Sequence, residues 1–587
     1  MNPVIPMKIH EAIRPSVRLM AYRFFLAVFS FAVWFSPWFY GLTRLKDQLS
    51  AQILIFFIFL PCIPLLKIET LFRLNLKSLD SWVFCSLLIG FAYVLISVIP
   101  WRSLELFSRF FSVVLVYWMT RTLVDTEKKF DFLLWVIFLM GAFYSIYGLL
   151  QYRGYLPKDF WYQDAFLAAR LVNGGHFAAF LLFPIFFGLC LLVRSGLLSR
   201  ILIATLLFIQ FFALLLTRSR TVWIAVALGI FIWVFFSLAK KTVPRKTLWG
   251  IVIVFLGIGL GLGQKFLPVI VERFAQVRSV HEVPFYTVVF RLELWQACLE
   301  AFRVRPWGWG IGTFSAVFPQ FRIGVDRFLI DYAHNEFFQI AVDFGMAGIA
   351  LLLGFLGFYL KTALNLLTQT GENDPLPLKS RCPSGSPEAE KISRSAVQKS
   401  GPREQQLVLF FSLFIGVVLS CQFDFPLRIY SNGILFAVFL ALSGFLFDRL
   451  SSPPPLSGER SRADKSGECP PPATLCLGVR AAVFFAVLGF GIFTAAHLYA
   501  QFQFEKAQKF EKNFEFDRAN PLYEKAVQWM PFSEVYRRGL GLYLDKSETL
   551  MFDSRKKAAV RNRAEAAFRD AVRLNPYEAA NHYYLAL

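Results

Sequence analysis

The sequence predicts an all-α fold: a polytopic bundle of about twelve to thirteen transmembrane helices with a large external loop and a C-terminal soluble helical domain. Hydrophobic residues make up 56% of the 587 positions and 68 of them are Phe, so much of the apolar surface must face lipid. Apolar runs long enough to cross a bilayer recur along the chain. After residue 500 the sequence becomes polar and keeps a helical period.

The predicted spans lie near residues 20–42, 51–66, 81–100, 104–120, 130–150, 176–193, 199–216, 221–239, 248–264, 337–360, 406–423, 432–448 and 479–500. Lys and Arg precede the first span and fill alternate loops, which predicts a cytoplasmic N-terminus and an external C-terminal domain. The first span lacks a small-residue cleavage site and is expected to be retained. Most of the +21 net charge lies in these loops, so it predicts orientation and no nucleic-acid site.

The chain divides into five predicted parts: N-terminal transmembrane helices (1–129), a transmembrane core (130–450) that includes an external loop (265–336), a flexible cytoplasmic linker (451–478), a last transmembrane helix (479–500) and a helical domain (501–587). Residues 366–404 are rich in Ser, Pro and charged residues and are also predicted to be flexible. The eight cysteines show no paired spacing, which indicates neither a disulfide framework nor a metal site.

Two segments of the C-terminal domain match each other. ANPLYEKAVQWMP (519–531) and AEAAFRDAVRLNP (564–576) both end in Ala-Val, an apolar residue and a proline. They resemble the second helices of tetratricopeptide repeats, whose usual period is about 34 residues. Since two repeats rarely stand alone, this domain is expected to pack on the membrane domain or on a protein partner.

The polar chemistry of the chain is concentrated between residues 291 and 348. The stretch from Arg291 to Pro306 predicts an amphipathic helix, with Leu, Trp and Phe at helical spacing (Leu292, Trp295, Leu299, Phe302) and a proline stop. The following PWGWGIGTF alternates glycines that permit unusual turns with aromatic residues that suit a membrane interface (Trp307, Trp309, Phe314).

His334 and Asn335 come directly before the span near 337–360, so the histidine is expected at a helix mouth. A neutral imidazole can take a proton from a hydroxyl as that oxygen attacks. Asp331 and Glu336 are candidates to orient His334, although helix capping by Asp331 or Asn335 explains the pattern equally well. Asp343 lies inside the span, where a carboxylate is costly, and is expected to face protein or a cavity and to pair with an arginine.

Arginines lie at two other helix ends that are predicted to be external. Arg218 and Arg220 occupy the turn TRSRT, where they either anchor helix ends among lipid headgroups or bind an anion such as a diphosphate. Arg170 and Asn173 precede the sixth span in RLVNGGHFAAF, and Arg170 is a further phosphate candidate. His176 in the same motif is expected to be an interfacial side chain.

The last predicted external turn, DFPLR, contains Asp424 and Arg428. Because these two opposite charges are close in sequence between two spans, we expect them to form a local ion pair.

Taken in order, TRSRT, RLELWQA with PWGWGIGTF, YAHNEFFQIAVDFGMAG and DFPLR resemble the O-antigen ligase and polymerase family of bacterial envelope glycosyltransferases over residues 130–450. The resemblance implies a multi-pass enzyme of the bacterial inner membrane that moves a glycan from an undecaprenyl-diphosphate carrier to an acceptor hydroxyl on the outer side. It implies Arg218, Arg220 and Arg291 as ligands of the donor diphosphate and His334 as the acceptor base, with inversion at the anomeric carbon and with no metal or other cofactor.

The sequence departs from many relatives at Gly175, where Asn-Pro-Asn-His-Phe-Ala is replaced by Asn-Gly-Gly-His-Phe-Ala, so any role of an asparagine there is lost. Ligation to a lipid acceptor, polymerisation on the carrier and glycosylation of a protein all remain open, and the repeat-like domain slightly favours a protein partner or acceptor. A transporter of lipid-linked glycans would place charges near the bilayer midplane, whereas these charges cluster at one face. A non-catalytic scaffold would not need so many spans.

Overall fold

The computed structural model describes residues 15–65, 76–158, 161, 166–240, 271, 288–322, 330–372, 387–451 and 473–586. Within these ranges all regular structure is helical, which confirms the predicted all-α class. The membrane-region helices are α1 (Pro15–Phe35), α2 (Leu45–Phe59) with η2 (Leu60–Leu65), α4 (Leu79–Leu95), α5 (Pro100–Leu123), α6 (Glu127–Tyr152), α7 (Gly174–Arg194), α8 (Leu197–Leu216), α9 (Arg220–Ala239), α13 (Glu336–Glu372), α14 (Pro387–Cys421), α15 (Tyr430–Ser451) and α16 (Ala473–Lys512).

Nine of the described helices are long and apolar enough to cross a membrane, namely α2 continued by η2, α6 to α9 and α13 to α16. The apolar helices in α1 and α4 are shorter, and α5 packs against α2, α4 and α15 although it carries several charges. These three bring the described bundle to twelve helices, and the predicted span near 248–264 lies outside the described residues. The chain is therefore a multi-pass membrane protein.

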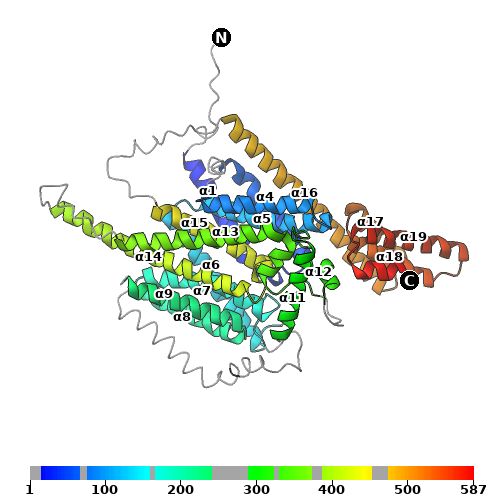
Figure 1. Cartoon of the computed structure of the whole chain (residues 1–587), viewed down its shortest axis with the longest axis horizontal. Helices are drawn as coiled ribbons and strands as arrows, with labels where there is room; N and C mark the ends of the chain where they lie inside the picture. Colours follow the sequence, from blue (N-terminus) through cyan, green and yellow to red (C-terminus); the bar gives the residue numbers. More distant parts are fainter. Residues whose placement is uncertain are drawn as a thin grey trace, which may run out of the picture.

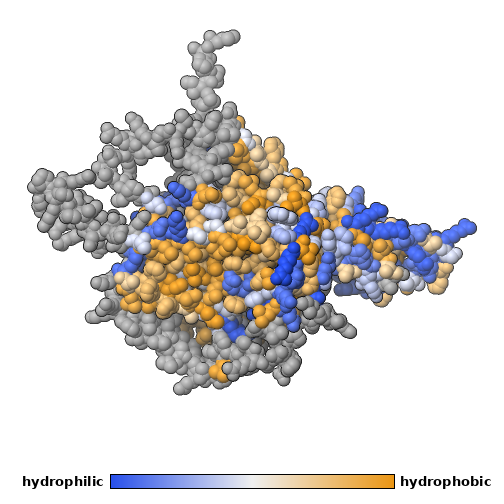
Figure 2. Space-filling view, viewed as in Figure 1, coloured by the Kyte–Doolittle hydropathy of each residue, from blue (hydrophilic) through white to orange (hydrophobic). Residues whose placement is uncertain are grey.

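Helix α7 is the most deeply buried of the described spans: 89% of its apolar stretch is covered by protein. It packs against α6, α8, α14 and α15. Small residues permit this close packing, because a Cβ on Gly141 of α6 would lie only 2.3 Å from Cβ of Pro184 in α7. The outer helices leave an apolar surface exposed, and Figure 2 shows it as a broad hydrophobic face on the bundle. Such a surface requires lipid as its solvent.

The loops that the span order places on one face do meet at one end of the bundle, which we call the site end. The Trp309 carbonyl accepts a hydrogen bond from the Val98 amide at 3.0 Å, and the Leu216 carbonyl accepts one from Leu167 at 3.0 Å. The site end comprises residues 36–44, 96–99, 166–173, 217–219, 305–322, 330–336 and 422–429. Two further helices lie between α9 and α13 in the chain, α11 (Val288–Val304) and α12 (Phe314–Val317).

The C-terminal helices α17 (Phe516–Trp529), α18 (Glu534–Thr549), α19 (Ser554–Leu574) and α20 (Ala579–Ala586) project from the site end (Figure 1). Helix α17 packs on the end of α16, and α19 packs on α18. Both segments that match in sequence are thus the second helix of a pair. Figure 2 shows a mostly hydrophilic surface on these helices, in contrast to the bundle.

Two predicted boundaries differ from the structure. Much of the predicted flexible segment 366–404 is helical, because α13 continues to Glu372 and α14 begins at Pro387. Helix α16 runs without a break across the predicted boundary at residue 500, so the last span and the helical domain share one helix of 40 residues. The predicted linker 451–478 lies mostly outside the described residues.

The apolar face predicted for the helix that follows Arg291 is not the face that the structure buries. Leu292 and Leu299 are 54% and 44% exposed. The buried face of α11 instead carries mainly small residues (Phe290, Leu294, Ala297, Cys298, Ala301). Small side chains allow the glycine-rich loop and α13 to approach α11 closely, so packing overrides the pattern of the largest residues.

Candidate active site

The glycine-rich loop fills a break in α13. At Gly345 the helix leaves helical geometry, with φ 55° and ψ −147°. The backbone of the loop replaces the missing helical hydrogen bonds: Pro306 O accepts from the Met346 amide, and the amides of Trp309 and Gly310 donate to the carbonyls of Val342 and Asp343, each at 2.9 Å. The PWGWG and DFGxxG motifs therefore form one interlocked unit.

Glycine is required on both sides of this contact. A Cβ on Gly345 would lie 2.1 Å from Pro306 O, and a Cβ on Gly308 would lie 2.6 Å from the Gly345 amide nitrogen. Both residues also have positive φ, at 55° and 83°. Because the obstructing atoms are backbone atoms, no side-chain rotation could relieve the clash.

The expected interfacial position of the loop tryptophans is only partly correct. Trp307 is 72% exposed, but Trp309 and Phe314 are buried, at 6% and 2% exposed. Trp309 donates its indole N–H to Ala301 O at 2.9 Å, and Ser103 Oγ donates to Ile311 O at 2.8 Å. The loop is thus anchored to α11 and to α5.

Asn335 caps α13 and holds the preceding histidine in place. Its Oδ1 accepts hydrogen bonds from the amides of Phe337 and Phe338, and its Nδ2 donates to Gln422 O at 2.8 Å. His334 itself has a positive φ of 49°. Asn335 therefore supports the site through the backbone, as a cap does.

His334 lies against Asp424. Its Nδ1 is 3.6 Å from Asp424 Oδ1, and its ring meets the Phe425 ring edge-on with centroids 4.9 Å apart. The His334 side chain is 33% exposed, so the imidazole is only partly covered by protein. The expected local pair of Asp424 with Arg428 is wrong, and Asp331, the expected orienting residue, is exposed while Asp424 takes its place.

Asp424 is held as a carboxylate. Burial alone would raise its pKa, but the close approach of the His334 imidazole, with His176 and Arg291 nearby, outweighs burial and keeps the pKa of Asp424 below its usual value. Asp424 can therefore fix the His334 imidazole and stabilise its protonated form.

Arg428 instead holds the beginning of α13. Its Nε donates to Glu336 Oε2 at 3.1 Å and its Nη2 to Asp343 Oδ2 at 3.2 Å. Asp343 is fully buried and also accepts from Gln339 Nε2 at 3.3 Å. Asp343, a carboxylate that is costly inside a span, thus has Arg428 as its partner. Through Glu336 and Asp343, Arg428 holds the first turns of α13, which begins two residues after His334.

His176, which the sequence analysis expected to be an interfacial side chain, lies near the His334–Asp424 pair. Its ring packs edge-on against Phe425 with centroids 5.6 Å apart, and its charge would act on both Asp424 and His334. Its Nδ1 is buried and has no hydrogen-bond partner among the described residues. A Cβ at Gly175 would lie 3.4 Å from Asp424 Oδ2, so the Asn-Gly-Gly-His variation brings backbone directly beside the carboxylate.

The predicted arginines separate into two groups. Arg291 lies close enough to Asp424 and to Arg220 for their charges to interact. Arg218 lies in the turn between α8 and α9, directly before Arg220, and has a positive φ of 55°. Arg170 donates from Nε to Trp38 O at 2.9 Å and stacks over the Trp38 ring, and its role as a diphosphate ligand stays a prediction. Asn173 caps α7 through the Gly175 amide.

Backbone strain also marks this end. Six described non-glycine residues have positive φ, and five of them (Leu42, Ala169, Val172, Arg218, His334) lie at the site end. Such strain persists where surrounding contacts over-determine a conformation, as at many active sites. The site end can thus bind an anion through its arginines, and His334 can accept a proton from a hydroxyl.

Residues 204–353 match the model of the O-antigen ligase family. The chain carries an O-antigen ligase domain. The match covers Arg218, Arg220, Arg291, His334 and the break in α13, whereas His176 and Asp424 lie outside it. A comparison with curated proteins finds no match.

The match to the O-antigen ligase domain indicates glycan transfer in polysaccharide biosynthesis at the level of reaction class. It also implies a lipid-linked glycan substrate and a membrane setting, which the apolar helices fit.

Proposed function

We propose that the protein is an inverting glycosyltransferase that moves a glycan from an undecaprenyl-diphosphate carrier to an acceptor hydroxyl. The observation that carries this proposal is the His334–Asp424 pair beside Arg291 and Arg220. A base and a cluster of cations at one helix mouth are the two parts that this reaction needs.

In the proposed step the acceptor O–H approaches the accessible nitrogen of His334 and loses its proton to the imidazole as the oxygen attacks the anomeric carbon. The new C–O bond forms as the bond from that carbon to the diphosphate oxygen breaks, and the bonding electron pair stays on the diphosphate. Asp424 at Nδ1 stabilises the imidazolium. The proton then passes to the departing diphosphate or to water.

Arg218, Arg220 and Arg291 would hold the diphosphate in this proposal. Arg220 and Arg291 repel each other, and an anion between them would relieve that repulsion. Planar guanidinium groups bind phosphate oxygens through paired hydrogen bonds, and they would neutralise the leaving group without a divalent ion. Asn335, Asp343 and Asn173 act through backbone and helix positions.

The proposed location is the bacterial inner membrane, with the N-terminus in the cytoplasm and the site end and helical domain in the periplasm. In this proposal the helical domain is a repeat module of the tetratricopeptide kind. It is docked on the active-site loop, where Arg102 donates to Ser315 Oγ at 2.7 Å and lies 3.9 Å from Glu534 Oε1 of α18.

That docking favours a second candidate, transfer of the glycan to a protein. The rings of Trp309 in the loop and Tyr577 in the α19–α20 turn are 6.1 Å apart, so a protein held by the helical domain would arrive next to the site. Repeat domains of this kind bind extended surfaces of proteins.

The test is transfer in proteoliposomes with fluorescent undecaprenyl-diphosphate glycan, a lipid-linked acceptor and a periplasmic protein fraction. We expect a fluorescent product with the parent and none with His334→Ala. A ladder of products indicates polymerisation, a single larger product indicates ligation, and label on protein supports the second candidate. Movement of the donor across the bilayer without any new glycosidic bond would replace the transferase with a transporter.

A further inference from the structure

The turn between α17 and α18 carries apolar side chains on its outer surface. Trp529 and Phe532 are 51% and 50% exposed, and Val535 in the first turn of α18 is 44% exposed. Glu534, between the last two, is instead only 7% exposed, and its Oε1 accepts a hydrogen bond from Asn575 Nδ2 at 3.2 Å. The large apolar side chains of the α17–α18 turn are thus exposed while its carboxylate is buried in protein, the reverse of the usual arrangement in water.

Ring contacts place the α17–α18 turn beside the last apolar turns of α16. The centroids of the Trp529 and Tyr499 rings are 4.9 Å apart. The centroid of the Phe532 ring is 4.5 Å from that of Trp101, which in turn is 5.5 Å from that of Phe493. The turn therefore lies level with the segment of α16 between Phe493 and Tyr499, although it belongs to the helical domain.

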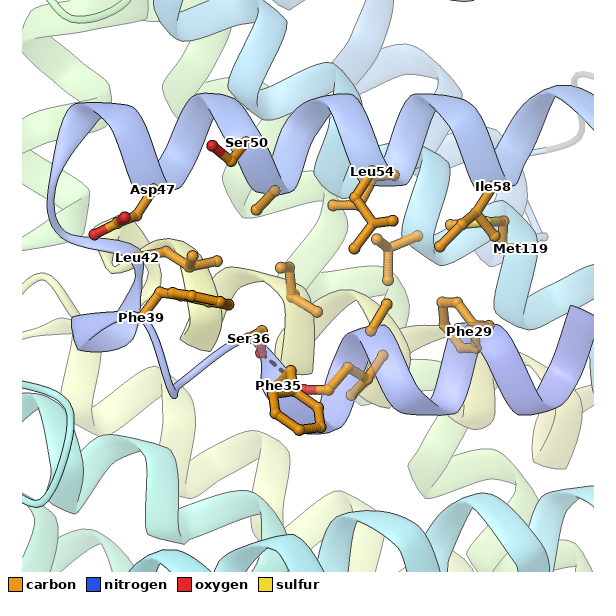
Figure 3. A pocket seen from close by; sticks show the side chains of 16 residues that line it. Phe29, Phe35, Ser36, Phe39, Leu42, Asp47, Ser50, Leu54, Ile58 and Met119 are labelled. Carbon is orange, nitrogen blue, oxygen red and sulfur yellow. Dashed lines mark hydrogen bonds between the residues drawn. The ribbon is translucent and has the colours of Figure 1, made fainter. Parts of the chain in front are cut away.

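The polar edge of the bundle lies further out along α16. Glu505 of α16 pairs with Lys46 at the beginning of α2, with 3.1 Å between Oε2 and Nζ. Asp47, the next residue of α2, lies at one end of a cavity of about 290 Å³ between α1 and α2 (Figure 3). The α2 residues that line this cavity from Ala51 to Ile58 are all apolar. Lys46, Asp47 and Glu505 thus mark the level at which the apolar part of α2 and α16 ends.

The helical rise converts these positions into depth. Tyr499 lies six positions and Phe493 twelve positions before Glu505 on the unbroken helix α16, which is about 9 Å and about 18 Å along its axis. A helix tilt of about 40° would reduce these depths by only about a quarter. The headgroup region adds only roughly 5–7 Å on each side of the hydrocarbon core. The α17–α18 turn therefore lies at the depth of the headgroups and the first acyl carbons.

The lipid-facing side of α16 continues directly to this turn. Exposed large apolar side chains recur on α16 at intervals of three, four or seven positions and so lie on one side of the helix (Phe485, Leu488, Ile492, Tyr499, Phe502). Trp529 extends this side, because its ring packs on that of Tyr499. Trp and Tyr are also the side chains that are enriched where a membrane meets water.

We infer that the α17–α18 turn inserts into the interfacial layer of the bilayer at the site end, so that phospholipid covers Trp529, Phe532 and Val535. This inference needs only the membrane spans and does not depend on the proposed reaction. On its other side the helical domain meets the glycine-rich loop, where the rings of Tyr577 and Trp309 are 6.1 Å apart. The lipid contact and the loop contact would together fix the height of the helical domain above the site end.

The first test examines the surroundings of one side chain at a time. A trifluoromethyl group is introduced on the ring of Phe532 or, as the matched control, on that of Phe552, which is fully exposed beyond the opposite end of α18. The full chain is placed in nanodiscs of phosphatidylcholine and phosphatidylglycerol. Fluorine relaxation is then measured with dissolved oxygen, which concentrates in lipid, and with a nickel chelate that stays in water. We expect the ratio of the oxygen effect to the nickel effect to be about tenfold higher at Phe532 than at Phe552, because oxygen is apolar and the chelate is not.

Two outcomes would overturn the inference. Relaxation at Phe532 mainly by the nickel chelate would mean that the α17–α18 turn lies in water. A signal that neither reagent relaxes would mean that protein, such as a second copy of this chain, covers Phe532 in place of lipid.

The second test measures the depth of Trp529. Phospholipids with bromine near the headgroup end or near the middle of their acyl chains quench the fluorescence of an indole that they contact. We expect Trp529→Phe to lower the quenchable intensity, and to do so more for the bromines near the headgroup. Trp233 is fully buried in the bundle, so Trp233→Phe should lower only the intensity that brominated lipid does not quench. Equal quenchable intensity in the parent and in Trp529→Phe would show that no lipid contacts Trp529, and the inference would be wrong.

Discussion

The two ends of the bundle differ in how several of their charged residues meet. At the end away from the site, four cations each meet a carboxylate from another helix: Arg121 meets Asp80 and Asp448, Lys240 meets Glu404, Arg194 meets Asp131, and Arg403 meets Glu127. These pairs connect helices and leave little local charge. Their arrangement explains packing and points to no ligand.

At the site end Arg428 is matched in the same way, by Glu336 and Asp343, but other charges there act on one another. Arg220 and Arg291 repel each other, while Asp424 faces His334, His176 and Arg291 together. Repulsion between like charges lowers the stability of the folded protein, and a bound anion would offset that repulsion. The contrast teaches that matched ion pairs mark structure, whereas a concentration of one sign marks the place where a charged substrate binds.

The largest expected effect comes from removing the base. His334→Ala should lower kcat for glycan transfer by about 10³-fold, because no other group would take the acceptor proton at that position. The measurement is initial rate in proteoliposomes with saturating donor and acceptor.

His176→Ala is the matched control for this prediction, since it removes the other imidazole beside Asp424. We expect it to cost much less than His334→Ala. Equal losses for the two variants would mean that the histidines act as one unit and that His334 alone is not the base.

The next largest effect tests the accumulated charge. Arg291→Ala should lower kcat/KM for the donor by about 10²-fold, through loss of charge-assisted hydrogen bonds to the diphosphate. Arg291→Lys should recover only part of the rate, because an ammonium keeps the charge but not the planar fork. Arg194→Ala removes a cation at the opposite end and should leave kcat/KM unchanged. If Arg194→Ala lowered kcat/KM for the donor by a similar factor, arginines at the two ends of the bundle would not differ in their effect on transfer.

A smaller effect is expected for Asp424→Asn, which keeps the shape but removes the charge that stabilises the imidazolium. We expect kcat to fall by about tenfold. The pKa of Asp424 is lowered in the folded protein from the usual 3.8, so its carboxylate contributes stability above pH 4 and loses that contribution as the pH falls through the lowered pKa.

Thermal unfolding in detergent checks the sign of this effect. The Asn variant should be less stable than the parent at pH 7, and the difference should narrow only below about pH 4. A difference that narrows already between pH 7 and 5 would show that the carboxyl titrates higher than its contacts with His334 and Arg291 imply.

The sequence predicted the class of the fold and singled out candidate site residues because hydrophobic length and charge position are local signals. Runs of apolar residues identified the helices, and His334, Arg218, Arg220 and Arg291 stood out as polar residues at helix ends. The partner of His334 could not be predicted in this way. Asp424 lies 90 positions further along the chain, and its nearby Arg428 offered a local partner that the fold assigns to α13.

Other contacts between distant segments were equally out of reach. The contact of Arg170 with Trp38 joins segments 132 positions apart, and the burial of Trp309 depends on a helix break that no local pattern near residue 309 reveals. Gly345 did carry a signal, since a glycine in an apolar span often permits close approach of another backbone. Contacts between distant segments decide roles that residue type alone leaves open.

The smallest effect on transfer is expected for Arg121→Ala, which breaks the ion pairs at the end away from the site. Arg121 donates to Asp80 at 3.0 Å and to Asp448 at 2.7 Å, and Asp80 also accepts from Tyr117 at 2.5 Å. Its loss leaves Asp80 largely buried without its cation, so stability should fall by about 3 kcal/mol while kcat per folded molecule stays unchanged. Unfolding by denaturant in detergent measures the first quantity, and the double variant Arg121→Ala/Asp80→Ala should be less destabilised than the sum of the single variants, because removing both partners leaves no uncompensated charge. If kcat instead falls tenfold in the folded variant, the two ends are coupled through α5, and the ion pairs away from the site serve catalysis as well as packing.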